Sequence, residues 1–286
     1  MTVANKAKVK MNVKDFPEHG LRLIGPSDSK FDQLLSAELQ NQSAEVIEAV
    51  KPYSVFLENR SDNSVVACVI EWAFTTPAGR NEYYREGVFD AHALMEAPQL
   101  SDVYKRQSGH IEPNGATLYS LLSTDGTSPM RIPLSPGEGE LFKQGKLDRA
   151  AIVEKTRSHL QSYTDITVTI DSAIFEDGSF VGTNSSGFFE RAKAAIQANQ
   201  DLLDEISLAQ NSKQTSSQPL YARLEEMANS RIDRLDSDST PNDYYNYFKA
   251  LYANDVLQSM RQFGDDKGIH FALTQKRRAW PKLHKK

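Results

Sequence analysis

The stretch YSVFLENRSDNSVVACVIEWAFTTPAG, residues 53–79, decides the fold class of this chain. Residues 53–58 alternate between two faces, which is the pattern of a half-buried strand. Residues 65–74 are apolar on nearly both faces, as expected for a strand inside a sandwich of sheets. Asn, Asp and Ser dominate the connection 59–64, and these residues favour turns. We therefore predict two strands joined by a polar turn.

Further strand patterns follow on both sides of this stretch. The dipeptide Asp177-Gly178 between apolar residues predicts a hairpin turn. Pro113-Asn114-Gly115 predicts another turn, directly before an apolar run. The additional predicted strands lie within residues 21–26, 80–89, 116–123, 165–175 and 179–182.

The apolar period changes to that of a helix after residue 184. The segment 185–206 places apolar residues on one stripe, with Ser185 or Ser186 as its cap and Glu190 in its first turn. Helices are also predicted within residues 30–50, 139–162, 220–236 and 244–263. Because most strands precede most helices, the pattern favours an α+β fold, an antiparallel Ig-like β-sandwich with a C-terminal helical segment.

The predicted domain organisation has four parts. Residues 1–20 form a flexible basic arm, 21–182 the β-sandwich with helical insertions, 183–275 the helical segment, and 276–286 a basic tail. The first fourteen residues hold four lysines, the last twelve hold six basic residues, and neither stretch holds an acid. All 38 acidic residues lie between them, against 23 basic ones. An acidic body repels a phosphate backbone, so we expect no nucleic-acid partner. We interpret the tail as a solvated terminus, with contact to an anion as the alternative.

The compartment is predicted from one cysteine and from hydropathy. Cys68 has no partner for an intramolecular disulfide, and its apolar neighbours predict a small core residue. The N-terminal residues carry positive charge without the apolar region of a signal peptide, and no apolar run reaches the roughly 20 residues that span a bilayer. We expect a cytoplasmic protein without a membrane span. An envelope or secreted location is the alternative if the true start lies upstream.

The search for catalytic and metal motifs finds little. The six histidines do not stand at metal-ligand spacing, and the chain has neither a phosphate-binding GxxxxGK[ST] loop nor a GxSxG elbow. The acidic stretch 233–243 departs from a calcium-binding EF-hand loop, because Pro241 and Tyr247 stand where glycine and glutamate are needed. We predict a capped polar turn there, no metal and no cofactor, and the catalytic residues, if any, are not indicated.

Aromatic residues concentrate near the start of the helix predicted over 244–263. We predict that they form a packing face between this helix and the sandwich, with a ligand or partner surface as the alternative. These residues are Tyr244, Tyr245, Tyr247, Phe248 and Tyr252.

Three stretches together resemble a known class of domain. YSVFLENRSDNSVVACVIEWAF, IEPNGATLYSLLS and VTIDSAIFEDGSFVG are similar in order and turn chemistry to small immunoglobulin-like bacterial domains. The resemblance covers roughly residues 50 to 208. It is strongest to uncharacterised bacterial proteins in which FEDGSFVG leads directly into a helix like FFERAKA. It implies a β-sandwich followed by helices and no activity, because a fold does not assign a function.

A second resemblance concerns DVYKRQ, residues 102–107. This string resembles the translation of a transposase adapter end used in DNA sequencing. We interpret it as a joining artefact in a sequence of metagenomic origin, which replaced the native residues somewhere between about 95 and 110. The alternative is an ordinary polar loop between strands. No functional inference here rests on Tyr104, Lys105 or Arg106.

Two hypotheses for function follow. The first is a non-catalytic binding or structural module that uses the Ig-like sandwich. Its partner would be another protein, and the sequence does not indicate its oligomeric state. The second is a hydrolytic enzyme of the glycan-active type, motivated by the many acidic residues. It requires two carboxyl groups from distant loops, about 5 to 10 Å apart in a cleft.

Overall fold

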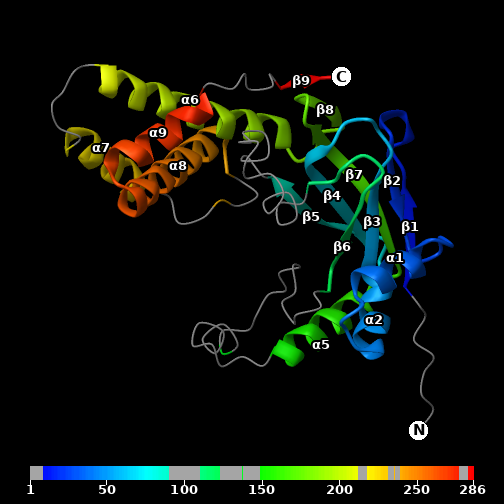
Figure 1. Cartoon of the computed structure of the whole chain (residues 1–286). Helices are drawn as coiled ribbons and strands as arrows, with labels where there is room; N and C mark the ends of the chain where they lie inside the picture. Colours follow the sequence, from blue (N-terminus) through cyan, green and yellow to red (C-terminus); the bar gives the residue numbers. More distant parts are fainter. Residues whose placement is uncertain are drawn as a thin grey trace, which may run out of the picture. The chain divides into compact units, whose positions relative to one another are not determined.

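The computed structural model describes residues 9–89, 110–122, 137, 149–211, 218–230, 235, 239–276 and 283–286 (Figure 1). The chain divides into two compact units. The N-terminal unit comprises residues 1–88 and 111–173, and the C-terminal unit comprises residues 89–110 and 174–286. The fold mixes helices with mainly antiparallel sheets and has a helical C-terminal region, as the sequence predicts.

Two sheets build the N-terminal unit. The smaller sheet has the antiparallel order β2 (Leu21–Ile24), β3 (Ser54–Asn59) and β6 (Ala116–Ser120), with Leu23 opposite Leu57. The larger sheet has the order β5 (Asn81–Phe89), β4 (Val65–Thr75) and β7 (Asp165–Phe175), and β8 and β9 follow β7 in the same order. Strand β1 (Lys10–Lys14) pairs with β7 in parallel, with Met11 opposite Ile166.

Residues 53–79 form the two predicted strands, but the strands do not form a hairpin. β3 and β4 belong to different sheets, so residues 60–64 cross from one sheet to the other. The buried amide of Asn59 holds this crossing: its Nδ2 donates to the carbonyl oxygens of Asn63 (2.8 Å) and Ile111 (2.9 Å). The strand character of β3 and β4 was visible in the sequence, and β4 is buried on nearly both faces as predicted. The predicted half-buried alternation of β3 is wrong, because only Glu58 of this strand is not fully buried. The partner of each strand depends on distant residues.

The predicted flexible arm is wrong for residues 10–14, which form β1, and the sheets are mainly but not entirely antiparallel because β1 pairs with β7 and β9 with β8 in parallel. Met11, Asn12 and Val13 are half-buried between two exposed lysines, Lys10 and Lys14, so the charge of the segment hides its strand character. A short 3₁₀-helix, Pro17–His19, follows β1. The sequence pattern did not indicate either element.

Three helices complete the described part of the N-terminal unit: α1 (Phe31–Glu38), α2 (Ala44–Val50) and α5 (Arg149–Leu160). A 3₁₀-turn, Lys51–Tyr53, links α2 to β3. The interior contains Trp72 and Phe74 of β4, both at most 1% exposed. Cys68 is buried beside them with its Sγ 2.9 Å from Oη of Tyr119, which confirms its predicted place in the core.

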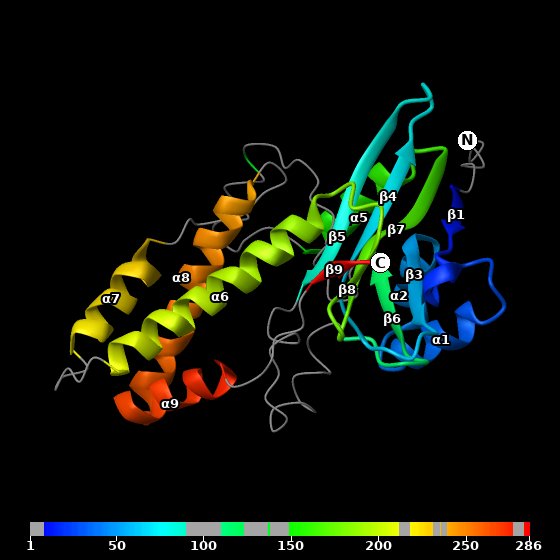
Figure 2. The same ribbon diagram turned by 90° about the horizontal axis from the view of Figure 1, so that it is seen from above.

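Four helices and a pair of short strands make up the described part of the C-terminal unit. The helices are α6 (Phe188–Asn211), α7 (Gln218–Asn229), α8 (Pro241–Phe263) and α9 (Asp265–Lys276). α8 packs against the other three (Figures 1 and 2). Their apolar stripes meet in one core, which consists of Leu202, Leu203, Ile206, Leu224, Tyr252, Ala253, Val256, Leu257, Met260, Ile269 and Ala272.

The predicted Asp177-Gly178 hairpin is confirmed, and α6 has a capping residue, Asn184, that the sequence prediction did not include. Gly178 has φ +82° and donates its N–H to the carbonyl of Phe175 at 2.8 Å, so β7 turns directly into β8 (Ser179–Gly182). The first turn of α6 is capped by Asn184, whose Oδ1 accepts from the N–H of Phe189 at 2.8 Å. An amide reaches this N–H because Asn184 adopts the left-handed conformation, with φ +56°.

Residues 264–268 end α8 and begin α9. Gly264 has φ +87° and closes α8, and Asp265 and Asp266 then occupy the first turn of α9, where acidic side chains are favoured. Gly268 is buried against α8, and a Cβ there would lie 2.5 Å from the backbone nitrogen of Met260. The glycine therefore permits the two helices to approach closely.

Candidate functional site

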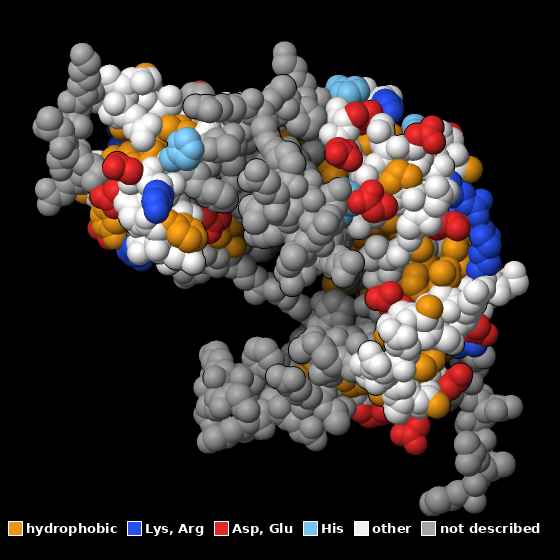
Figure 3. Space-filling view, in the orientation of Figure 1, with side chains coloured by type: hydrophobic (Ala, Val, Ile, Leu, Met, Phe, Trp, Pro, Cys, Tyr) orange, Lys and Arg blue, Asp and Glu red, His pale blue; other side chains and the backbone are white. Residues whose placement is uncertain are grey.

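A groove between α6 and α7 is the candidate functional site. Its volume is about 430 Å³. Most of its lining is aliphatic, and Figure 3 shows hydrophobic side chains among charged ones on these helices. The lining residues are Leu202, Glu205, Ile206, Leu208, Ala209, Pro219, Leu220, Arg223, Leu224 and Met227.

The helix periodicity explains why the groove is apolar. Leu202 and Ile206 lie one turn apart on α6 and are buried against α8, so the groove borders the helical core. From α7, Leu224 is 1% exposed and reaches the same core. Leu208 is 70% exposed. An exposed large apolar side chain beside an apolar groove is a typical feature of an interaction surface.

A chain of polar contacts borders the groove. The carboxylate of Glu205 lies 2.6 Å from Nζ of Lys249 and 2.9 Å from a guanidinium nitrogen of Arg223. Burial by itself would lower the pKa of Lys249, but the hydrogen bond and charge of Glu205 outweigh burial and raise that pKa. Nearby, Tyr245 donates to the carboxylate of Asp201 at 2.7 Å. These contacts join charged and polar side chains of α6, α7 and α8.

Acidic residues predominate on the two helices that form the groove. Among the described residues 201–211 and 218–229, five are acidic and one, Arg223, is basic. Lys249 and Arg261 of α8 pair with two of these acids, Glu205 and Glu225. With these two cations counted, the described segments 201–211 and 218–229 of the two helices still carry an excess of acidic residues, which would attract a basic partner.

The aromatic residues of α8 lie in contacts within the helical unit. Tyr252 is buried in the helical core and Phe248 packs against it. The ring of Tyr244 lies 5.2 Å from the guanidinium of Arg191 on α6, which also donates to its hydroxyl at 3.0 Å. These contacts lie within the helical unit, and the predicted packing of these residues against the sandwich stays a prediction. The apolar stripes of four successive helices cover one another, which the stripe of α8 alone could not indicate.

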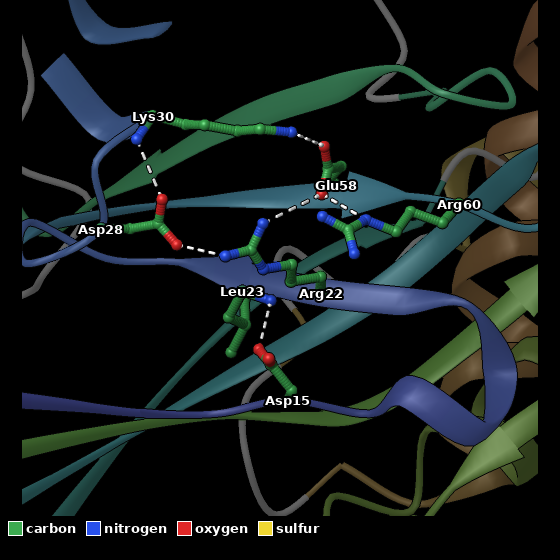
Figure 4. Close-up of polar contacts among 7 residues, drawn as sticks. All are labelled: Asp15, Arg22, Leu23, Asp28, Lys30, Glu58 and Arg60. Carbon is green, nitrogen blue, oxygen red and sulfur yellow. Dashed lines mark hydrogen bonds and ion pairs between the residues drawn. The ribbon is translucent and has the colours of Figure 1, made fainter. Parts of the chain in front are cut away.

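A cluster of five charged side chains lies on β2, β3 and the residues that follow β2 (Figure 4). Glu58 lies 2.6 Å from Arg60, 3.6 Å from Lys30 and 3.8 Å from Arg22. Arg22 also pairs with Asp28, whose carboxylate accepts from the backbone N–H of Lys30 at 2.9 Å. Because each cation meets an acid within the cluster, we interpret it as a link between this segment and the sheet, not as an anion site.

Three titratable side chains of the N-terminal unit also meet. Tyr163 donates its hydroxyl hydrogen to Glu82 at 2.5 Å and lies 3.0 Å from Nε2 of His159. Since a phenol has one hydrogen, the imidazole donates the second hydrogen bond. Burial, followed by the hydrogen bond and charge of Glu82, raises the pKa of Tyr163 well above its ordinary value. We interpret this cluster as a contact that fixes the end of α5 to β5.

The remaining sequence candidates are scattered. His92, the Asp233, Asp236 and Asp238 part of the acidic stretch, and residues 102–107 lie outside the described residues. The described histidines occupy separate segments: His19, His110, His159, His270 and His284. Among described residues, no group of three or more His, Cys, Asp or Glu side chains is placed to hold a metal ion.

The capped turn predicted near residue 240 is confirmed. The hydroxyl of Thr240 accepts from the N–H of Asp243 at 3.2 Å, and the Asp243 carboxylate accepts from the N–H of Thr240 at 2.8 Å. These reciprocal bonds form a capping box at the start of α8.

Comparison with known proteins supplies no further assignment. No family model matches the chain, and no curated protein or solved structure is significantly similar to it. In the part of the chain that the structure describes, no helix is long and apolar enough to cross a membrane. The argument for function therefore rests on the geometry of the described residues.

Sequence reasoning did not find the groove. The apolar stripes of α6 and α7 were visible, and both predict burial. The available signal was Leu208, which belongs to the apolar run of α6 but lies two residues past the stripe that ends at Ile206. Which part of each stripe stays uncovered depends on where α8 and α9 pack.

Proposed function

We propose that this chain is a non-catalytic protein-binding module, and that the α6–α7 groove receives the apolar face of a basic amphipathic helix from a partner protein. The observation that carries this proposal is the groove itself, an aliphatic cleft of about 430 Å³ between two helices. Helix-in-groove recognition uses apolar side chains at i, i+3/i+4 and i+7 that enter such a cleft.

The charged residues around the groove favour a helical partner as its ligand and argue against a small polar molecule. A small-molecule site normally combines apolar walls with a few convergent polar groups that orient the ligand. Here the charged lining residues Glu205 and Arg223 pair with each other. They leave apolar contact as the main attraction inside the groove, and the acidic surroundings select basic residues on the flanks of the partner.

The immunoglobulin-like arrangement of the N-terminal unit stays part of the proposal. Support comes from β3 and β4, which are consecutive in the chain but lie in different sheets, as in a sandwich with crossing connections. The alternative hydrolase requires two carboxylates facing a shared cleft. The carboxylate of Glu58 in the N-terminal unit and that of Glu205 in the helical unit are each engaged by two or more cations. No specific observation therefore favours the hydrolase.

A synthetic peptide tests the proposal. A fluorescein-labelled amphipathic helix with leucines at i, i+4 and i+7 and lysines on its far face should bind the full chain in an anisotropy titration. A scrambled peptide of the same composition should bind much more weakly. Leu208→Glu should weaken binding of the amphipathic peptide by at least about tenfold, as expected when a central apolar contact is replaced by a charge.

Phe263→Glu provides the matched control, because Phe263 is also a largely exposed apolar residue of the helical unit (54%) but does not line the groove. The Phe263→Glu chain should bind the amphipathic peptide with the same affinity as the unmodified chain. Equal binding of the ordered and scrambled peptides, or equal effects of the two substitutions, would contradict the proposal.

A further inference from the structure

The outer edge of β8 is occupied by a distant part of the same chain. Strand β9 (His284–Lys285) pairs with β8 in parallel, with His284 opposite Ser179 and Lys285 opposite Phe180. The N–H groups of His284 and Lys286 donate to the carbonyl oxygens of Gly178 (3.1 Å) and Phe180 (3.0 Å). Figures 1 and 2 both show β9 alongside β8. Since edge strands present unpaired backbone groups, this edge is suited to take an added strand.

Each lysine of this segment meets a carboxylate and the face of an aromatic ring. Nζ of Lys285 lies 3.6 Å from the carboxylate of Glu190 and 4.8 Å from the ring centre of Phe189. Such a pair combines an ionic contact with a cation–π contact. Both partners belong to the first turn of α6.

The next residue repeats this arrangement with different partners. Nζ of Lys286 lies 3.8 Å from the carboxylate of Asp177 and 5.8 Å from the ring centre of Phe175. Consecutive residues of an extended chain point to opposite sides. Two adjacent lysines can therefore reach two separate carboxylate–ring pairs, one on α6 and one on the β7–β8 turn. Figure 3 shows basic, histidine and acidic side chains next to one another over β8 and β9.

Residues outside the tail hold both carboxylates in place. Asp177 accepts hydrogen bonds from the Ser179 N–H (2.8 Å) and hydroxyl (2.6 Å), and Glu190 accepts from the Asn184 amide (2.8 Å). Burial of Asp177 would raise its pKa, but the Ser179 hydrogen bonds and the charges of Lys286 and His284 lower it overall. The site is thus preorganised by local bonds that do not need the tail.

The tail is held by contacts of modest strength. β9 has two residues, and the side chains of Lys285 and Lys286 remain about half exposed, at 55% and 49%. Ion pairs of that exposure contribute little stability and are screened by salt. An extended ligand with similar chemistry could therefore displace the tail.

We infer that the β8 edge is a strand-addition site for an extended segment with two adjacent lysines, supplied by a partner protein, and that residues 284–286 occupy it as a displaceable strap of the same chain. The chemistry that recognises the partner is the pair of carboxylate–ring contacts together with the open backbone groups of β8. This site is separate from the α6–α7 groove, and either can exist without the other.

Peptide binding to a shortened chain tests the inference. The probe is fluorescein-labelled PKLHKK, the sequence of residues 281–286, and the variant is the full chain lacking residues 283–286. The peptide should bind the shortened chain at least about tenfold more tightly than the full chain, because a tethered strap competes at a high effective concentration. The peptide PKLHAA should lose most of this binding.

Substitutions in the shortened chain locate the contact. Asp177→Asn and Glu190→Gln should each weaken PKLHKK binding by at least about threefold. Glu176→Gln is the matched control, since Glu176 is an exposed carboxylate in the same turn, and it should leave the affinity unchanged. Circular dichroism and the melting temperature establish that each variant is folded.

Several results would overturn the inference. Equal affinity of PKLHKK for the full and shortened chains would show that the tail does not compete. Equal binding of PKLHAA, or no binding of PKLHKK to a folded shortened chain, would remove the lysine site. A full chain that dimerises in size-exclusion chromatography, and loses the dimer on deletion, would show that the tail occupies a second copy instead.

Discussion

Replacing Leu224 by alanine should separate α7 from the helical core. Leu224 is 1% exposed and belongs to that core, while the other α7 residues whose burial the structure describes are half-buried or exposed. A buried leucine-to-alanine change costs about 2–5 kcal/mol, through lost transfer energy and the cavity that remains. Because Leu224 also borders an open groove of about 430 Å³, the substitution removes fewer packing contacts than it would at a leucine surrounded by the core on all sides. We therefore expect a loss of about 2–3 kcal/mol in unfolding free energy.

Leu220→Ala is the control for this prediction. It deletes the same atoms from the same helix, but Leu220 is half-buried and packs against the edge of the core. Its cost should be about 1 kcal/mol, in proportion to the smaller buried apolar area. Urea unfolding followed by the helical circular dichroism signal measures both values. If Leu224→Ala cost no more than Leu220→Ala, the assignment of Leu224 as the anchor of α7 would be refuted.

Three further predictions concern single polar contacts. The carboxylates of Asp177 and Glu190 have lowered pKa values. Their contribution to holding β9 should therefore be present above about pH 4 and be lost as the pH falls through these lowered values. Amide hydrogen exchange of β9 measures this contribution, and unchanged protection at strongly acidic pH would contradict it. Tyr163→Phe removes a buried hydroxyl that donates to Glu82, and should lower the unfolding free energy by about 1–3 kcal/mol in urea titrations; a neutral effect would show that this contact is unimportant. Thr240→Ala should cost about 1 kcal/mol by loss of the capping box of α8, while Thr240→Ser should restore most of it in thermal melts.

Most elements of this fold have local signals in the sequence. The alternation over the first half of β7, the Asp177-Gly178 turn and the 3.6-residue period of α6 depend on neighbouring residues, so the sequence indicates them directly. The errors fall where the signal is not local. The lysine-rich segment of β1 gains its strand structure from pairing with β7, more than 150 residues later in the chain. The charge pattern alone indicates a solvated arm.

The candidate sites are less predictable than the elements that carry them. Leu202 and Leu224 belong to apolar helical faces that are buried, and only the position of Leu208 beyond the stripe of α6 signals its exposure. The tail had two interpretations, a solvated terminus and contact with an anion. The structure places Lys285 and Lys286 beside carboxylates of the same chain while their side chains remain about half exposed.

The amino-acid sequence by itself determined the type of most strands and helices, the turns between them, the burial of Cys68 and the division into a strand-rich and a helix-rich part. Those properties follow from side-chain period, turn chemistry and hydrophobicity within a few residues. Tertiary structure decided which strands pair, that β3 and β4 lie in different sheets, which apolar surface remains uncovered between α6 and α7, and that β9 pairs with β8. These outcomes depend on contacts between residues tens to more than a hundred positions apart, and such contacts leave no periodic signal in either of the segments that form them.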